Sequence, residues 1–142
     1  MVSAMSLSEN GWVEHMVQLR LIDFDVLGHL NQSVYHTILE QARTELFGLL
    51  AGHNEGFVMA HVEMDYRAEV AMPTSWVTVQ TRVERIGRSS LTLFQRVLRP
   101  DGKLANEATS VLVGWDRTAR RSRPFSDEER ARFAALPSTA AV

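Results

Sequence analysis

The residues best suited to chemistry lie close together near the start of the chain. Two carboxylates are followed by a glycine and a run of polar side chains, and these residues are Asp23, Asp25, Gly28, His29, Asn31, Gln32, Ser33 and Tyr35. The carboxylate of Asp25 can act as a general base toward water or as a nucleophile toward an activated acyl carbon. A carboxylate beside glycine also commonly accepts hydrogen bonds from turn amides, so both roles stay open for Asp25, whereas Asp23 is interpreted as a turn-forming residue.

A long helix is predicted directly after this cluster, from about Gln32 to Leu50, with Asn31 as its N-cap. Its apolar residues recur every three or four positions: Val34, Tyr35, Ile38, Leu39, Ala42, Leu46, Leu49 and Leu50. The amides of Gln32 and Ser33 at the helix start lack partners inside the helix and lie at the positive end of its dipole. Such amides can polarise a carbonyl oxygen as an oxyanion hole does. A carboxylate beside them provides the minimum needed to transfer an acyl group to water.

The other polar residues of this stretch have both functional and structural interpretations. His29 can orient a water, a carbonyl or the carboxylate, but a turn histidine bonded to the backbone fits the sequence as well. Asn31 is assigned mainly to the cap. Tyr35 is expected in the core with its hydroxyl paired. Glu40 and Arg43, three residues apart on the helix, are expected to pair with each other.

Two basic stretches are candidates for binding phosphate. Residues 85–90 read RIGRSS, and its possible donors to a phosphate group are Arg85, Arg88, Ser89 and Ser90. A solvated bulge or turn explains this stretch equally well. Residues 117–123, RTARRSR, are better explained as a solvated segment than as a phosphate contact.

The rest of the chain alternates in the manner of strands, predicted over residues 12–21, 57–70, 76–84, 91–98 and 104–115. Residues 52–56, GHNEG, are predicted to end the long helix, and Arg99 to Lys103 to form a hairpin turn. Ser126 and Glu129 make a capping box for a short helix that ends at about Leu136. Because no β-α-β alternation exists, the predicted class is α+β: one long helix against a curved antiparallel sheet of five or six strands. We expect a flexible segment over residues 1–11, a single domain over 12–136 and a loose tail over 137–142.

Composition and missing motifs exclude several other classes of function. The net charge of −2 gives no basic face for nucleic acid, and the absence of cysteine excludes thiolate sites and disulfides. The chain has no G-x-S-x-G, G-x-G-x-x-G or Walker motif, and its histidines lack the spacing of a zinc site, so neither metal nor cofactor is expected. No apolar run reaches the roughly 18 residues of a membrane span, and no signal peptide precedes the first strand. We therefore expect a cytoplasmic protein with no membrane partner.

The central motif resembles the signature of a known family. D-x-D-x-x-G-H-x-N-x-x-x-Y, here from Asp23 to Tyr35, is followed by E-x-x-R at Glu40 and Arg43. This pattern is similar to that of the hotdog-fold acyl-CoA thioesterases of the 4-hydroxybenzoyl-CoA thioesterase type. The resemblance extends to VEMDYRAEV after the long helix and to IGRSSLTL at the next junction, and it covers about Val13 to Trp115.

The resemblance implies a hotdog fold in which an extended antiparallel sheet wraps the long helix, and a dimer with active sites at its interface. It implies that Asp25 is the base or nucleophile, that the backbone amide of Gln32 polarises the thioester carbonyl, and that residues 85–90 lie near coenzyme A. The family commonly has asparagine where this chain has Gln32. That difference would affect a role of the Gln32 side chain, but not the role of its backbone amide. Leu27 replaces the asparagine of plant acyl-carrier thioesterases, which argues against that subgroup.

The predicted function is hydrolysis of an acyl-CoA to a free acid and CoA, with CoA as part of the substrate. His29 and Asn31 are expected to give supporting polar contacts. The residues expected to contact substrate are Ser33, Tyr35, Arg85, Arg88, Ser89 and Ser90. Two alternatives remain: a thioesterase acting on acyl-carrier protein, for which free CoA would not compete, and a non-catalytic acyl-CoA-binding protein, which would release no thiol. A homodimer or a dimer of dimers is expected.

Overall fold

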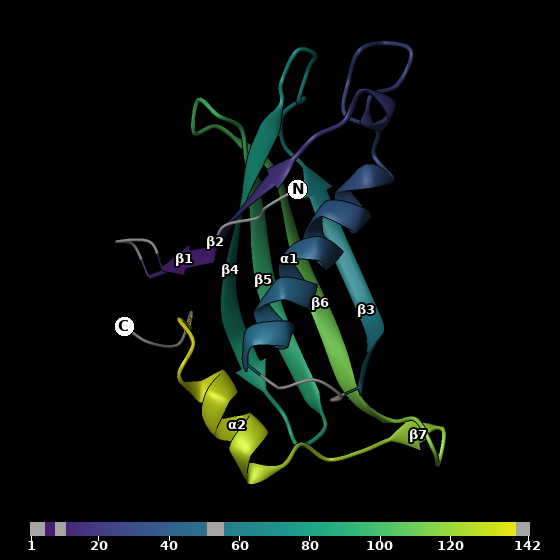
Figure 1. The fold of residues 1–142 in the computed structure, drawn as a ribbon, viewed down its shortest axis with the longest axis vertical. Coiled ribbons are helices and arrows are strands. Elements are labelled where there is room, and N and C mark those ends of the chain that lie inside the picture. Colours follow the sequence, from purple (N-terminus) through teal and green to yellow (C-terminus); the bar gives the residue numbers. More distant parts are fainter. Residues whose placement is uncertain (1–4, 8–10, 51–55, 139–142) are drawn as a thin grey trace.

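The protein is described by a computed structural model that covers residues 5–7, 11–50 and 56–138 (Figure 1). In chain order, its elements are β1 (Met5–Leu7), β2 (Val13–Gln18), a short 3-10 helix (Leu21–Asp23), α1 (Val34–Leu50), β3 (Gly56–Tyr66), β4 (Trp76–Ile86), β5 (Ser90–Leu98), β6 (Leu104–Asp116), β7 (Arg121–Ser122) and α2 (Asp127–Ala134). None of the helices in this part of the chain is long and apolar enough to span a membrane.

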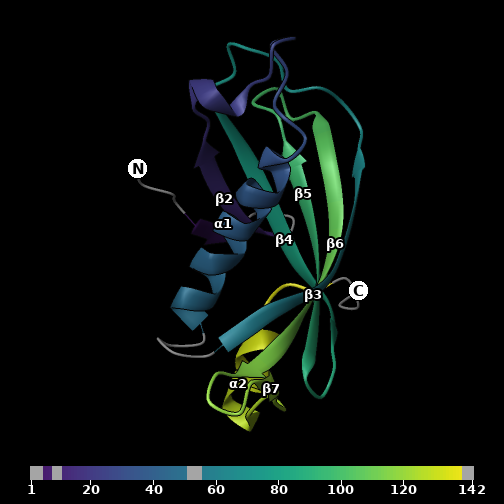
Figure 2. The same ribbon diagram turned by 90° about the vertical axis from the view of Figure 1, so that its right-hand side faces the viewer.

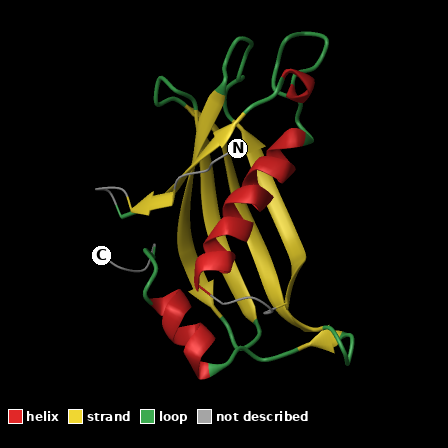
Figure 3. Cartoon of the chain, in the orientation of Figure 1, coloured by secondary structure: helices red, strands yellow, loops and turns green. Residues whose placement is uncertain are grey.

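The described strands form one antiparallel sheet in the order β1-β2-β4-β5-β6-β3, with β7 paired to β6. Helix α1 lies across one face of this sheet, and the side view shows the strands curving around it (Figure 2). Colouring by secondary structure shows α2 as the other main helix, at the lower end of the sheet (Figure 3). The predicted α+β class, with a long helix against an antiparallel sheet, is confirmed.

The buried face of α1 forms the main core against the sheet. Its fully or nearly fully buried residues are Tyr35, Ile38, Leu39, Ala42 and Leu46. These positions follow the three-to-four spacing of the sequence, because that spacing places them on one side of a helix. The first four pack with apolar residues of the sheet and its adjoining loops, including Val17, Leu30, Val70, Val77, Val79, Val97 and Ala108.

A second apolar cluster lies where α2 meets the sheet. Phe133 of α2 is fully buried and packs with Phe125, Leu91, Leu93 and Leu112. The predicted capping box is present: Ser126 Oγ accepts from the Glu129 amide at 3.1 Å, and a Glu129 carboxylate oxygen accepts from the Ser126 amide at 2.8 Å. Glu129 also pairs with Arg123. The capping box thus fixes where α2 begins.

Several predicted boundaries need correction. Helix α1 begins at Val34 rather than Gln32, because residues 31–33 form a turn. The predicted strand over 12–21 ends at Gln18, and a 3-10 helix begins at Leu21. Strand β3 ends at Tyr66 rather than at residue 70. Strand β7 was not predicted. The helix end predicted over 52–56 lies outside the described residues, apart from Gly56, which begins β3.

The two chain ends also differ in part from the expected loose segments. Residues 5–7, within the predicted flexible segment, form β1 and pair with residues 13–15 of β2. At the other end, the carbonyl oxygen of Pro137 accepts from the Val83 amide at 2.8 Å, and Ser138 forms a bridge with Val83. The remaining terminal residues lie outside the described part.

The packing of the main core predicts how a core substitution changes the free energy of unfolding. Leu39 is fully buried under the sheet, so Leu39→Ala should lower the free energy of unfolding by about 2 to 5 kcal/mol through lost burial and a cavity. Urea denaturation measures this loss. Thr37→Ala, at an exposed position on the same helix, should change the free energy by about 0.5 kcal/mol or less. Equal effects of the two variants would contradict the assigned packing of α1.

Candidate active site

Asp25 shapes the loop that precedes α1. Its Oδ1 atom accepts hydrogen bonds from the amides of Leu27 at 2.9 Å and His29 at 3.1 Å. Gly28 has a φ of +75°, a conformation that suits glycine, and its amide donates to the Asp25 carbonyl oxygen at 3.0 Å. Asp25 therefore has the turn-forming role that its sequence context allows. Its side chain is nevertheless exposed, and Oδ2 accepts no hydrogen bond from any described residue.

This loop is held by backbone hydrogen bonds to the segment between β3 and β4. The Leu30 amide donates to the Val70 carbonyl oxygen at 2.7 Å, and the Met72 amide donates to the Gly28 carbonyl oxygen at 2.9 Å. His29 consequently lies opposite Ala71 in a short antiparallel bridge. These contacts join segments that are about 40 residues apart in the sequence and fix the position of His29.

His29 has a carboxylate partner in the same segment. Its Nε2 atom lies 2.6 Å from an Oε atom of Glu69, and both side chains are about half exposed. Glu69 was not identified as a site residue from the sequence. It lies in VEMDYRAEV, one of the stretches that carried the family resemblance, but nothing in that stretch indicates which residue meets His29.

At the start of α1, the amides of Gln32 and Ser33 differ in their hydrogen bonds. Asn31 Oδ1 accepts from both the amide and the hydroxyl of Ser33, each at 3.1 Å, so the Ser33 amide is engaged within the chain. Because α1 begins at Val34, the predicted N-cap role of Asn31 is wrong: its side chain caps the turn that precedes the helix. The Gln32 amide, in contrast, has no acceptor among the described residues. The carbonyl oxygen of Gln32 accepts from the Tyr66 hydroxyl at 3.2 Å.

Two tyrosines lie at the same place. Tyr35 is buried, with 3% of its surface exposed, and meets Tyr66 edge to face with ring centroids 5.3 Å apart. Burial, with a smaller contribution from Tyr66, raises the pKa of Tyr35 to about 12. Tyr35 is thus a core residue whose ring lies beside the loop of Asp25.

A cavity of about 640 Å³ contains half of the predicted site residues. It is lined by Asp25, His29, Leu30, Asn31, Gln32, Tyr35, Tyr66, Arg67, Ala68 and Glu69. All four residues predicted to be catalytic and one predicted substrate contact, Tyr35, are therefore brought together. The last four residues of the lining come from the end of β3 and the segment after it.

The basic stretch over 85–90 lies elsewhere in the chain. It comprises the last two residues of β4, the turn of residues 87–89 and the first residue of β5. This hairpin is at the lower end of the sheet, whereas the loop of Asp25 is at the upper end (Figure 1). Its backbone is tied to the region around α2: the Phe125 amide donates to the Arg88 carbonyl oxygen at 2.9 Å, and Arg130 donates to that of Gly87 at 2.6 Å. Within one chain, then, Arg85, Arg88, Ser89 and Ser90 do not share the cavity of Asp25.

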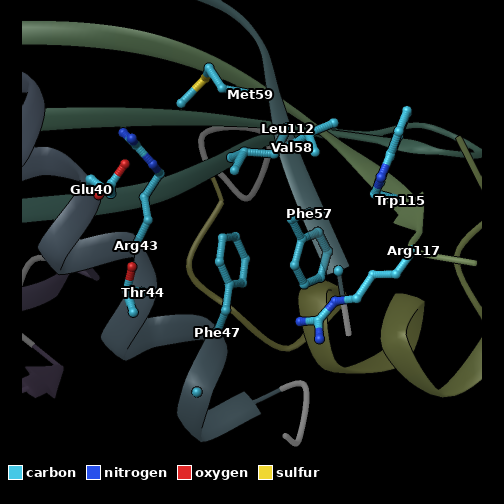
Figure 4. A pocket seen from close by; sticks show the side chains of 12 residues that line it. Glu40, Arg43, Thr44, Phe47, Phe57, Val58, Met59, Leu112, Trp115 and Arg117 are labelled. Carbon is cyan, nitrogen blue, oxygen red and sulfur yellow. The ribbon is translucent and has the colours of Figure 1, made fainter. Parts of the chain in front are cut away.

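A second cavity, of about 610 Å³, lies between α1 and the edge of the sheet (Figure 4). Its lining combines aromatic and apolar side chains with charged ones: Glu40, Arg43, Thr44, Phe47, Gly48, Gly56, Phe57, Val58, Met59, Leu112, Trp115 and Arg117. Phe47 and Phe57 stack within it, with ring centroids 4.7 Å apart.

The contacts of Arg43 differ from the expected pairing with Glu40 on α1. It is buried and donates to Gln95 Oε1 at 3.0 Å and Ser110 Oγ at 3.4 Å on the sheet, instead of forming an ion pair with Glu40. Burial lowers the pKa of Arg43, and the charge of Glu40 partly opposes this shift. Arg43 therefore joins the helix to the sheet through a buried polar contact.

The residues that the structure describes contain no group of three or more histidine and carboxylate side chains able to hold a metal ion. The absence of a metal or cofactor stays a prediction.

Comparison with known proteins identifies the family. The model of the thioesterase-like superfamily matches residues 19–133. The chain belongs to this superfamily. A crystal structure of a thioesterase from Thermus thermophilus, complexed with coenzyme A and Zn, is 33% identical, covers 89% of this chain and 96% of its own, and superposes with a TM-score of 0.77.

Two further relatives agree with this assignment. The long-chain acyl-CoA thioesterase FadM of Escherichia coli is 23% identical over 125 residues, which are 83% of this thioesterase and 94% of FadM. The structure of a predicted thioesterase from Bacillus stearothermophilus is 26% identical, covers 85% of this chain and 92% of its own, and has a TM-score of 0.78. The resemblance inferred from the central motif and the prediction of a thioester hydrolase are confirmed.

The buried tyrosine of this thioesterase predicts a pH effect on stability. Tyr35 has a pKa of about 12 in the folded chain against an ordinary value of about 10, so above pH 10 the unfolded chain releases this proton first. The Tyr35 contribution to the free energy of unfolding should therefore fall as pH rises from about 10 to about 12. Urea denaturation over this range, compared with Tyr35→Phe, measures the contribution.

The titration can also be observed directly. The chain has two tyrosines, so in Tyr66→Phe the tyrosinate absorbance reports Tyr35 alone. Ionisation of Tyr35 near its ordinary pKa in the folded protein would contradict the burial described here.

Proposed function

We propose that this thioesterase hydrolyses an acyl-CoA to the free acid and CoA, with Asp25 as base or nucleophile and the Gln32 amide as the oxyanion donor. One observation carries the assignment: Asp25 and Gln32 line the same cavity, and each retains a polar atom that is unused by the described chain. Asp25 Oδ2 is a free acceptor and the Gln32 amide a free donor. The two groups complement an attacking water and a carbonyl oxygen, respectively.

In the general-base route, the Asp25 carboxylate takes a proton from water as the water oxygen bonds to the thioester carbonyl carbon. The carbonyl π electrons move onto oxygen, and the Gln32 amide stabilises that oxyanion. The tetrahedral intermediate then collapses, the carbon–sulfur bond breaks, and the thiolate takes the proton from Asp25. The products are the acid and the thiol, and Asp25 is again a carboxylate.

In the nucleophilic route, the Asp25 carboxylate attacks the carbonyl carbon and the thiolate leaves, forming a mixed anhydride that water then hydrolyses. Both routes need the same carboxylate and the same amide donor. The exposed position of Asp25 gives a thioester access from solvent in either case.

The choice of coenzyme A as the carrier is supported by two relatives. FadM acts on long-chain acyl-CoA according to its name, and the Thermus thermophilus thioesterase was crystallised with coenzyme A. The family resemblance inferred from the central motif implies the same carrier. We therefore favour acyl-CoA over an acyl-carrier protein.

We further propose that two copies pair through β3. This strand ends the sheet order, so its outer edge pairs with no described strand, and a free edge of eleven residues is a ready template for another strand. Val58 and Met59 on β3 are 37% and 40% exposed. Antiparallel pairing centred on His61, the middle residue of β3, would place Gly56 of one copy opposite Tyr66 of the other.

Such pairing would join the two cavities across the dimer. Gly56 lines the second cavity and Tyr66 lines the cavity of Asp25, so each aromatic cavity would lie beside the catalytic cavity of the other copy. The two-fold axis would also bring the lower end of one sheet to the upper end of the other. Arg85, Arg88, Ser89 and Ser90 then remain candidates for the phosphate groups of CoA, contributed across the interface.

Replacement of the catalytic carboxylate tests the activity. Asp25→Asn keeps an oxygen that can accept from the Leu27 and His29 amides, so the turn should survive while the base is lost. We expect kcat for thiol release to fall about 100-fold to 10,000-fold, with KM changed little. The assay covers short-chain, long-chain and aromatic acyl-CoAs.

Glu128→Gln, on the exposed face of α2, is the matched control and should keep wild-type turnover. Full turnover by Asp25→Asn on every accepted acyl-CoA would contradict the role of Asp25. Tight binding of acyl-CoA by the wild-type protein without thiol release would favour the non-catalytic alternative.

The dimer makes a separate prediction. His61→Glu would place two carboxylates opposite each other at the proposed axis, and like charges directly opposite each other destabilise strand pairing. We expect analytical ultracentrifugation to show a dimer for the wild type and for His61→Gln, and a shift toward monomer for His61→Glu. An unchanged dimer in His61→Glu would argue against pairing at β3.

A further inference from the structure

The proposed hydrolysis assigns roles to Asp25 and Gln32 but none to His29 or Glu69, which contact each other. We propose, on the basis of the function proposed above, that Glu69 is a positioning residue. It fixes the ring of His29 so that His29 and Asp25 together hold the attacking water. The observation that carries this assignment is the 2.6 Å contact between His29 Nε2 and Glu69 inside the cavity that Asp25 also lines.

The backbone holds both partners of this pair in place. His29 is flanked by the hydrogen bonds of Gly28 and Leu30 to residues 70–72, and Glu69 directly precedes that segment. On the other side, Arg99 donates to the carbonyl oxygen of Glu69 at 3.2 Å. The contact therefore joins two anchored segments, unlike an ordinary exposed ion pair between freely moving side chains.

The neighbouring cations are engaged with other carboxylates. Arg67, which lines the same cavity, pairs with Glu107 at 2.7 Å and with Asp65 at 3.3 Å. The side chain of Arg99 pairs with Asp101. Among the described residues, the carboxylate of Glu69 has His29 as its ion-pair partner. Glu69 is thus directed at the imidazole.

This contact determines which nitrogen of His29 can accept a hydrogen bond. A carboxylate only accepts, so a neutral ring that donates to Glu69 across this contact carries its proton on Nε2. In the neutral ring, Nδ1 then carries the lone pair and is an acceptor. Without Glu69, both tautomers and several ring orientations would be accessible.

An acceptor on His29 complements the acceptor on Asp25. A water that donates one hydrogen to Asp25 Oδ2 and the other to His29 Nδ1 has a lone pair left to direct at the thioester carbonyl carbon. The proton still leaves to Asp25, as in the general-base route, and His29 only orients the water. Orientation of a nucleophile in this way lowers the entropic cost of reaching the transition state.

A double-mutant cycle tests the coupling. We expect Glu69→Ala to lower kcat about 10-fold to 100-fold, as removal of the partner of a functional histidine commonly does, with KM within about 2-fold of wild type. Glu69→Gln keeps an acceptor oxygen near Nε2 and should recover much of this loss. In the His29→Ala background, Glu69→Ala should lower kcat no further, because the residue through which it acts is gone.

The control is Glu128→Ala, which removes an exposed carboxylate from an ion pair on α2 and should leave kcat and KM unchanged. Additive losses in the double variant, or a loss seen only in KM, would overturn the positioning role. Additive losses would show that Glu69 acts without His29, and a loss only in KM would show that it acts on substrate binding.

A spectroscopic readout keeps this test independent of turnover. Nitrogen-15 NMR of the histidine ring should show the Nε2–H tautomer for neutral His29 in the wild type and a mixture of tautomers in Glu69→Ala. The Nδ1–H tautomer in the wild type, or a spectrum that Glu69→Ala leaves unchanged, would overturn the proposal. If Asp25→Asn retained full turnover, the function proposed above would fail, while the NMR result would still decide the role of Glu69.

Discussion

The packing of α1 against the curved sheet is the interaction on which the rest of the structure depends. Leu39 and Ala42 are fully buried there, under strands that contribute Val77, Val79 and Val97. Burial of this apolar face contributes favourably to the free energy of folding. It also fixes where the helix begins. The Gln32 amide has a defined position beside the loop of Asp25 because the helix cannot shift along the sheet without exposing its buried face.

Asp25 illustrates how one side chain can be both structural and chemical. One carboxylate oxygen accepts from two loop amides, and the other accepts from none of the described residues. These two hydrogen bonds restrain the carboxylate, so less rotational freedom has to be lost when a substrate binds. The two interpretations of Asp25 therefore describe different oxygen atoms of the same group. In the proposed role of Glu69, its contact with His29 would restrain the imidazole in the same way.

The positions of the two cavities favour pairing of two copies at the outer edge of β3, which no described strand occupies. One cavity contains the candidate chemistry, while the other is lined by aromatic rings and lies near the opposite end of the same strand. A single chain keeps them apart. Antiparallel pairing of two β3 strands would join each catalytic cavity to an aromatic one, so the proposed dimer would make a site that neither chain has alone.

The sequence by itself determined the fold class, the buried face of α1, the capping box of α2 and the cluster from Asp25 to Tyr35, because these depend on local spacing and local hydrogen bonds. Only the tertiary structure decided that Glu69 meets His29, that Arg43 bonds the sheet instead of Glu40, and that residues 85–90 lie away from Asp25 in the same chain. Those outcomes depend on which distant segments the sheet brings together. A local sequence pattern does not predict contacts between segments that are 40 or more residues apart and that strand pairing brings together.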